Sequence, residues 1–119
     1  MEFVIREALS PIKDEITIAF VFGSSARHQQ ASESDIDLFI LGDVSLKDLS
    51  PHLRVAEDRL GKPINSVIYS KASFIEKYQQ GDPFMADVVQ REKLVVFPEH
   101  VTGKEIKNDL RRLASVHVA

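Results

Sequence analysis

The sequence predicts an α/β (α+β) domain in which helices flank a mixed four-stranded sheet. Short runs rich in β-branched and aromatic residues alternate with segments of helical spacing, which is the first observation behind this prediction. The second is that capping residues bound most of the helical segments. The third is size: 119 residues with 44% hydrophobic residues suit one compact domain, so residues 1–119 are expected to form a single unit.

The first third of the chain predicts one helix and two strands. Apolar residues recur at near-helical spacing over 3–12, which predicts a short helix disturbed near Pro11. Residues 16–22, ITIAFVF, are a β-branched and aromatic run and predict a buried central strand. A polar loop follows over 28–33, and a second strand is predicted over 35–41.

The middle of the chain predicts a capped helix and a third strand. Ser45 opens a capping box for a helix that continues to Leu60, and Gly61 is expected to cap its C-terminus. Pro51 indicates a late start or a place in the first turn of this helix. A strand is predicted over 63–69.

The last third predicts three helices and a short strand. A helix is expected over 74–80, capped by Ser70 or Ser73, and another over 83–89, with Asp82 as its N-cap. A last helix is expected over 102–113, and an edge strand over 94–97. The aromatic residues expected in the core are Phe3, Phe20, Phe22, Phe39 and Phe74.

Composition excludes several classes of protein. The formal net charge of −3 argues against a broad DNA- or RNA-binding surface. No cysteine is present, so neither a disulfide framework nor a thiolate zinc site is expected. A helix that spans a bilayer needs about 20 consecutive apolar residues, and no segment approaches this length. The N-terminus does not resemble a signal peptide. A cytoplasmic protein with no membrane partner is therefore expected.

Two neighbouring segments predict a site for a metal ion and a phosphate. Asp35 and Asp37 alternate with apolar residues, so both are expected on one face of a strand, about 7 Å apart. Just upstream, Gly23 would let a ligand approach the backbone closely, and Ser24 or Ser25 could donate hydrogen bonds to phosphate oxygens. The expected phosphate ligands are therefore Ser24, Ser25 and Arg27.

These residues resemble a known family. Gly23-Ser24-Ser25-Ala26-Arg27 followed by Ser34-Asp35-Ile36-Asp37-Leu38 is similar to the nucleotidyltransferase superfamily related to DNA polymerase beta, in its minimal form. The resemblance implies the nucleotidyltransferase fold, catalytic carboxylates at Asp35 and Asp37 that bind Mg²⁺ or Mn²⁺, and a glycine-serine turn that binds the phosphates of a nucleoside triphosphate.

The resemblance also implies a third carboxylate on a later strand, and here the sequence departs from the family. The matching position holds Asn65, which is neutral and cannot act as a carboxylate base. Asn65 is either a weak metal ligand or an ordinary polar strand residue. Without the resemblance, the two aspartates could simply be the polar residues on the solvent-facing side of a strand, and Arg27 could form a surface salt bridge.

Three hypotheses follow. The leading one is a Mg²⁺-dependent enzyme, ATP-binding or specific for another nucleoside triphosphate, that transfers a nucleoside monophosphate to an acceptor hydroxyl. The second is a catalytically altered, nucleotide-binding regulatory module. The third is an antitoxin-like partner in a toxin–antitoxin pair. A homodimer or a helical partner protein is plausible, because a lone small domain covers little of its substrate.

Overall fold

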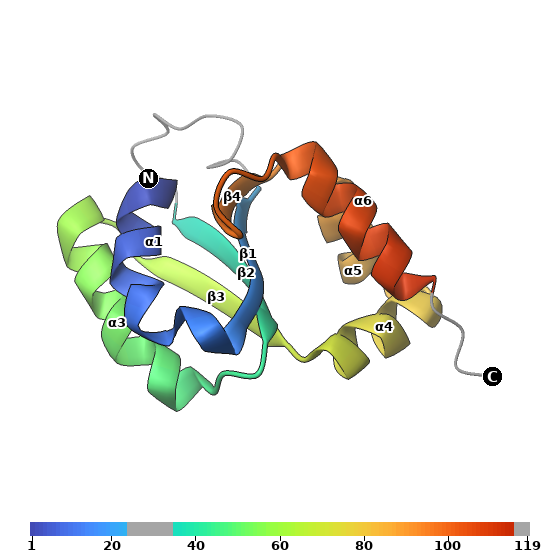
Figure 1. Cartoon of the computed structure of the whole chain (residues 1–119), viewed down its shortest axis with the longest axis horizontal. Helices are drawn as coiled ribbons and strands as arrows, with labels where there is room; N and C mark the ends of the chain where they lie inside the picture. The colour runs from blue at the N-terminus through green and yellow to red at the C-terminus, as the bar shows by residue number, and fades with distance from the viewer. Residues whose placement is uncertain (24–34, 116–119) are drawn as a thin grey trace.

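A computed structural model describes residues 1–23 and 35–115, and within them the chain forms a four-stranded mixed sheet (Figure 1). The strand order is β3-β2-β1-β4. β1 (Ile16–Phe22) pairs antiparallel with both β2 (Ile36–Gly42) and β4 (Leu94–Phe97), whereas β3 (Ile64–Tyr69) pairs parallel with β2. The predicted fold class is confirmed, and 94–97 is an edge strand as expected.

Helices cover both faces of this sheet. Figure 1 shows α1 and α3 on one side and α4, α5 and α6 on the other. A short 3₁₀ segment, η1, continues α1 and leads into β1. The bounds are α1 (Glu2–Leu9), η1 (Ser10–Glu15), α3 (Leu46–Leu60), α4 (Lys71–Gln79), α5 (Pro83–Gln90) and α6 (Gly103–Ala114).

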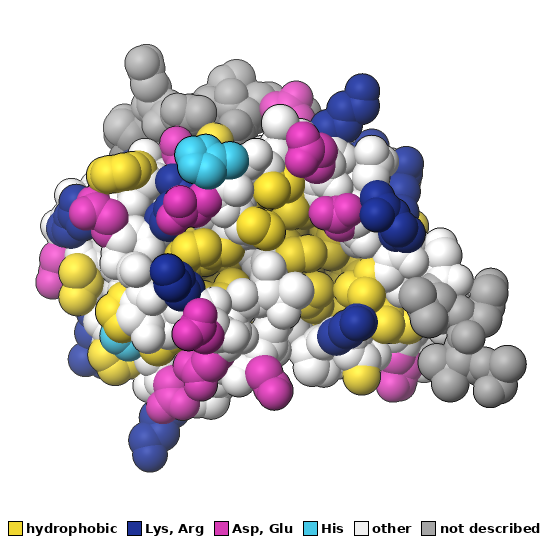
Figure 2. Space-filling model, viewed as in Figure 1, with side chains coloured by type: hydrophobic (Ala, Val, Ile, Leu, Met, Phe, Trp, Pro, Cys, Tyr) yellow, Lys and Arg dark blue, Asp and Glu magenta, His cyan; other side chains and the backbone are white. Residues whose placement is uncertain are grey.

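Alternation along the strands divides the buried side chains into two cores. Ala19 and Val21 of β1 face α1 and α3, and we call this cluster the α1–α3 core. Ile18 and Phe20 face the other helices and belong to the α4–α6 core. Because side chains alternate along a strand, each face of the sheet receives its own apolar set. Figure 2 shows hydrophobic side chains between the sheet and α4 and α6, where the second core reaches the surface.

Stacked aromatic rings fill much of the α4–α6 core. Phe39 is completely buried, with its ring centroid 5.0 Å from that of Phe20 and 5.6 Å from that of Tyr69. Phe74 of α4 meets Phe39 edge-on at 6.3 Å. Offset and edge-on ring pairs of this kind stabilise a core beyond the area they bury.

Side-chain caps fix where the helices begin. The Ser45 hydroxyl accepts a hydrogen bond from the Asp48 amide at 3.1 Å, which confirms Ser45 as the N-cap of α3. Ser70 and Asp82 cap α4 and α5 in the same way. Gly61 ends α3 with a positive φ of 68°, which confirms the predicted C-cap.

Three sequence-based expectations were wrong in detail. Phe3 was expected in the core but is 60% exposed, because α1 buries the face that carries Ile5 and Leu9. Pro51 lies inside α3, beyond its first turn, so the helix starts earlier than the proline suggested. The helix predicted over 74–80 begins earlier, at Lys71, because Ser70, one of the two expected caps, is its N-cap.

Among the helices of residues 1–23 and 35–115, none is both long and apolar enough to cross a bilayer.

Candidate functional site

The two predicted carboxylates lie at one end of β2, on the sheet face that α4–α6 cover. Ile36 and Leu38 are completely buried in the α1–α3 core, which turns the odd-numbered residues to the opposite face. Asp37 is half-buried at this position, and Asp35 is exposed immediately before the strand. Both carboxylates therefore point to one side, as the alternation predicts.

The turn after β1 approaches Asp37 closely. Phe22 is the cross-strand partner of Asp37, so Gly23 follows directly beside the carboxylate. Gly23 has φ +77°, and a Cβ built on it would lie 3.0 Å from Oδ2 of Asp37. Glycine adopts this backbone conformation at no steric cost, and its missing side chain leaves room for the carboxylate.

Asn65 joins these residues from the neighbouring strand. The parallel register of β2 and β3 pairs Asn65 with Asp37. The Asn65 amide Nδ2 donates a hydrogen bond to Oδ2 of Asp35 at 3.2 Å. The neutral residue at the position where the family resemblance implies a third acid therefore contacts the first carboxylate directly.

The structure thus brings four predicted site residues together: Gly23, Asp35, Asp37 and Asn65. The other three, Ser24, Ser25 and Arg27, lie outside the described residues. Within residues 1–23 and 35–115 there is no group of three or more His, Cys, Asp or Glu residues that could hold a metal ion. Two carboxylates and one amide are therefore the donor set that the described chain offers.

This donor set fits a hard divalent cation. Mg²⁺ binds oxygen ligands and usually retains several waters, so one or two protein carboxylates suffice when phosphate oxygens complete its shell. Asp35 and Asp37 provide carboxylate oxygens on one face, and Asn65 adds an amide oxygen that can also ligate. Mn²⁺ accepts the same kind of ligand.

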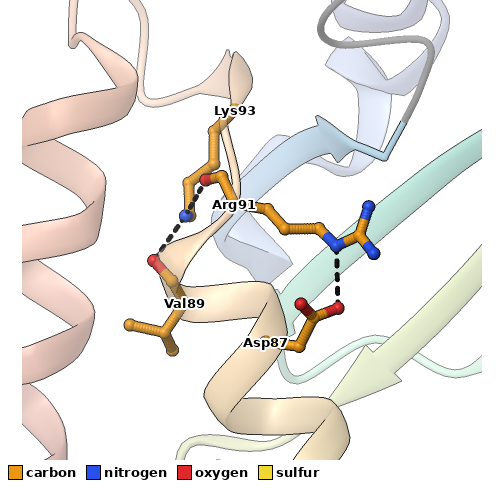
Figure 3. A network of polar contacts seen from close by, with 4 residues as sticks. All are labelled: Asp87, Val89, Arg91 and Lys93. Atoms are coloured by element: carbon orange, nitrogen blue, oxygen red, sulfur yellow. Dashed lines mark hydrogen bonds and ion pairs between the residues drawn. The ribbon is translucent and has the colours of Figure 1, made fainter.

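A partly buried lysine lies at the same end of the sheet but is engaged in structural contacts. Lys93 immediately precedes β4, whose first residue pairs with Val21 of β1. Its Nζ donates to the carbonyl oxygens of Val89 at 2.7 Å and Arg91 at 2.6 Å (Figure 3). It also lies 5.3 Å from the centroid of the Phe20 ring. Lys93 therefore holds the turn between α5 and β4.

The environment of Lys93 disfavours its charge. Burial, together with the nearby cations Lys107 and Arg111, lowers the pKa of Lys93 from 10.5 to about 8. A neutral amine still has two hydrogens, so both carbonyl contacts survive deprotonation. The Arg91 guanidinium beside it donates to Asp87 at 2.7 Å in an exposed i,i+4 pair (Figure 3).

An aromatic side chain near the carboxylates was missed by the sequence reasoning. Phe84, the second residue of α5, is 37% exposed, and its ring centroid lies 6.1 Å from that of Phe22. Phe22 is in turn the cross-strand partner of Asp37. Phe84 and Asp37 are more than forty positions apart in the sequence, so no local pattern could have connected them.

Comparison with known proteins identifies the class to which this fold and site belong. The family model described as polymerase beta, nucleotidyltransferase matches residues 5–99. The chain belongs to this nucleotidyltransferase family, and the predicted resemblance is confirmed. In a comparison with curated proteins, none matches this chain.

Solved structures share the fold at low sequence identity. A crystal structure described as a toxin-antitoxin with AMP-PNP is similar with a TM-score of 0.58 and 15% identity, over 95% of this chain and 80% of that one. A crystal structure of the toxin-antitoxin MntA-HpeT mutant gives a TM-score of 0.56 and 14% identity, over 96% and 80% of the two chains. At sequence identities this low, the structural similarity shows a common fold alone.

Proposed function

We propose that this chain is a metal-dependent nucleotidyltransferase that transfers a nucleoside monophosphate from a nucleoside triphosphate to an acceptor hydroxyl and releases pyrophosphate. The observation that supports this most is the contact between the Gly23 turn and Asp37, with Asp35 and Asn65 on the same face. This is an oxygen-rich site beside a backbone turn whose first residue has no side chain.

Each residue has a distinct part in this proposal. Asp35 and Asp37 would hold Mg²⁺ or Mn²⁺, which, when bound, neutralises phosphate charge and orients the groups that react. Gly23 lets the phosphates approach the backbone, and the serines that follow it would donate to their oxygens. The Asn65 amide would keep Asp35 oriented through the observed hydrogen bond.

This site differs from one with three carboxylates in which group accepts the proton of the attacking hydroxyl. Asn65 is neutral and cannot take a proton from the attacking hydroxyl. The proton would therefore pass to water or to a base that the acceptor itself brings. General bases typically contribute 10²–10⁴-fold, so slow turnover is expected with a simple alcohol as acceptor.

A second function is favoured by the same residue. The Asn65 amide, bonded to Asp35, suits a domain that binds nucleotide without turnover and acts as the regulatory member of a pair. Two structures of similar fold are described as toxin-antitoxin proteins, one of them with AMP-PNP. Under the transferase function, by contrast, a protein partner of that kind would supply both the acceptor hydroxyl and the missing base.

Incubation with Mg²⁺ or Mn²⁺ and each labelled nucleoside triphosphate tests both functions. Metal-dependent pyrophosphate release that Asp37→Asn abolishes would support the transferase. The Asn65→Asp variant should then turn over faster, because it restores a carboxylate beside Asp37. Asp43→Asn is the matched control, because Asp43 lies beyond the other end of β2.

The outcomes separate the two functions. Metal-dependent nucleotide binding without pyrophosphate release, in the wild type and in Asn65→Asp alike, would replace the transferase with the regulatory function. Failure of every nucleotide to bind with either metal would exclude both. Equal activity of Asp37→Asn and the wild type would show that the chemistry does not use this site.

A further inference from the structure

An exposed aromatic ring lies beside the carboxylate end of the sheet without belonging to either core. Phe84 is 37% exposed, whereas its neighbour in sequence, Met85, is completely buried. Among the described residues, the Phe84 ring meets the Phe22 ring edge-to-face, at 6.1 Å between centroids and an interplanar angle of 73°. An edge-to-face contact covers at most one face of a ring, so part of the Phe84 ring remains accessible.

The backbone around Phe84 is fixed on both sides. Asp82 accepts a hydrogen bond from the Met85 amide at 3.3 Å, and its carbonyl accepts another from Ala86 at 3.0 Å. Pro83 occupies the first position of α5, where its φ is already set for a helix. Phe84 is therefore presented on the first turn of a capped helix, and its ring has only two side-chain torsions left to order.

The location of the ring relates it to the proposed nucleotide site. Phe22 contacts Phe84 on one side and pairs with Asp37 across the strands on the other. The Cβ atoms of cross-strand partners are about 4.5–5.5 Å apart, so a single aromatic residue, Phe22, separates Phe84 from the Asp37 carboxylate. A nucleotide with its phosphates at Gly23 and Asp37 would have its base within reach of this ring.

We infer that Phe84 is the stacking surface for the base of the bound nucleoside triphosphate. The inference rests on the proposed nucleotide-binding function and adds how the base is held. Every base has an aromatic face, so stacking of this kind tolerates purines and pyrimidines alike. The polar phosphate end would bind at the carboxylates, and the flat apolar end at Phe84.

A comparison of nucleotides with inorganic tripolyphosphate tests the stacking directly. Tripolyphosphate has the phosphates but lacks a base, so its affinity in the presence of Mg²⁺ reports the phosphate site alone. Replacing a stacking aromatic residue typically costs about 1–3 kcal/mol, or about 5- to 150-fold in affinity. We expect Phe84→Leu to lower the affinity for each nucleoside triphosphate by a factor in this range and to leave the affinity for tripolyphosphate unchanged.

A fluorescent variant reports the same contact. The chain has no tryptophan, so Phe84→Trp introduces a single reporter at the proposed base site. Its emission should change saturably with a nucleoside triphosphate and not with tripolyphosphate. Phe3 is the matched control, because it is a 60% exposed phenylalanine on α1, at the other face of the sheet. Phe3→Leu should bind nucleotides as the wild type does, and the emission of Phe3→Trp should not change when a nucleotide is added. Circular dichroism establishes that all variants are folded.

The outcomes distinguish this inference from the function on which it rests. Equal loss of nucleotide and tripolyphosphate affinity in Phe84→Leu would show that Phe84 only shapes the site, and would overturn stacking. Unchanged nucleotide affinity, or an unresponsive tryptophan at position 84, would overturn it as well. If wild-type protein binds neither nucleotide nor tripolyphosphate with metal, the proposed function itself is wrong and the stacking role falls with it.

Discussion

Replacing Gly23 with alanine should damage the carboxylate site more than it damages the fold. Gly23 has φ +77°, and an alanine Cβ there would lie 3.0 Å from Oδ2 of Asp37. An L-residue in the left-handed region costs about 1–2 kcal/mol. The carboxylate must also move by a few tenths of an ångström to restore an ordinary contact, which displaces the atom proposed to bind the metal.

Two other glycines separate these effects. Gly61 and Gly81 have φ values of +68° and +78°, and a Cβ built on either meets nothing within 4 Å. Gly61→Ala and Gly81→Ala therefore experience the backbone cost alone. Each should lower the free energy of unfolding by about 1–2 kcal/mol and the melting temperature by about 4–8 °C.

The assay combines denaturation with metal binding. Urea denaturation gives the free energy of unfolding, and electron paramagnetic resonance of free Mn²⁺ gives the metal affinity. We expect Gly23→Ala to lose a similar amount of stability and about 10-fold or more in Mn²⁺ affinity, the usual effect of disturbing the surroundings of a metal ligand. The other two variants should bind Mn²⁺ as the wild type does. Wild-type Mn²⁺ affinity in Gly23→Ala, or equal losses in all three variants, would refute the reasoning.

Three further predictions concern stability. Because folding lowers the pKa of Lys93 from 10.5 to about 8, the unfolded state binds more protons than the folded state between these pH values. The melting temperature of the wild type should therefore rise from pH 8 to 10 relative to that of Lys93→Met. The same pH dependence of the melting temperature in both proteins would contradict this. Phe39→Ala should cost about 3–5 kcal/mol in urea denaturation, whereas Phe3→Ala at its exposed position should cost less than about 0.5 kcal/mol; similar losses would be inconsistent with their burial. Ser45→Ala should cost about 1 kcal/mol by removing the cap on the Asp48 amide, and an unchanged urea midpoint would argue against that cap.

Local patterns account for most of what the sequence predicted. The run over 16–22 is apolar on both faces and became β1 with the predicted bounds, because a central strand buries both faces. The alternation around Asp35 and Asp37 correctly placed both on one face, since a strand repeats every two residues. Capping chemistry located the start of α5 at Asp82 and Pro83.

Tertiary contacts account for the rest. The hydrogen bond from Asn65 to Asp35 depends on β3 lying parallel to β2 in one register, which no local pattern specifies. The apolar residues of α1 fit more than one helical face, so the exposure of Phe3 depends on how α1 packs against α3. Phe84 and Phe22 meet only because α5 folds back over the end of β1.

The alternation along β2 also determines which insertions and deletions the chain can tolerate. Ile36, Leu38 and Ile40 fill the α1–α3 core, while Asp37 and Phe39 face the other side. Loss of one residue from this strand would exchange the faces, placing a carboxylate in the core and isoleucines at the site. Loss of a pair of residues would preserve the facing. Insertions or deletions within β2 should therefore be tolerated only when they add or remove an even number of residues. An odd number would disturb the α1–α3 core and the carboxylate site together.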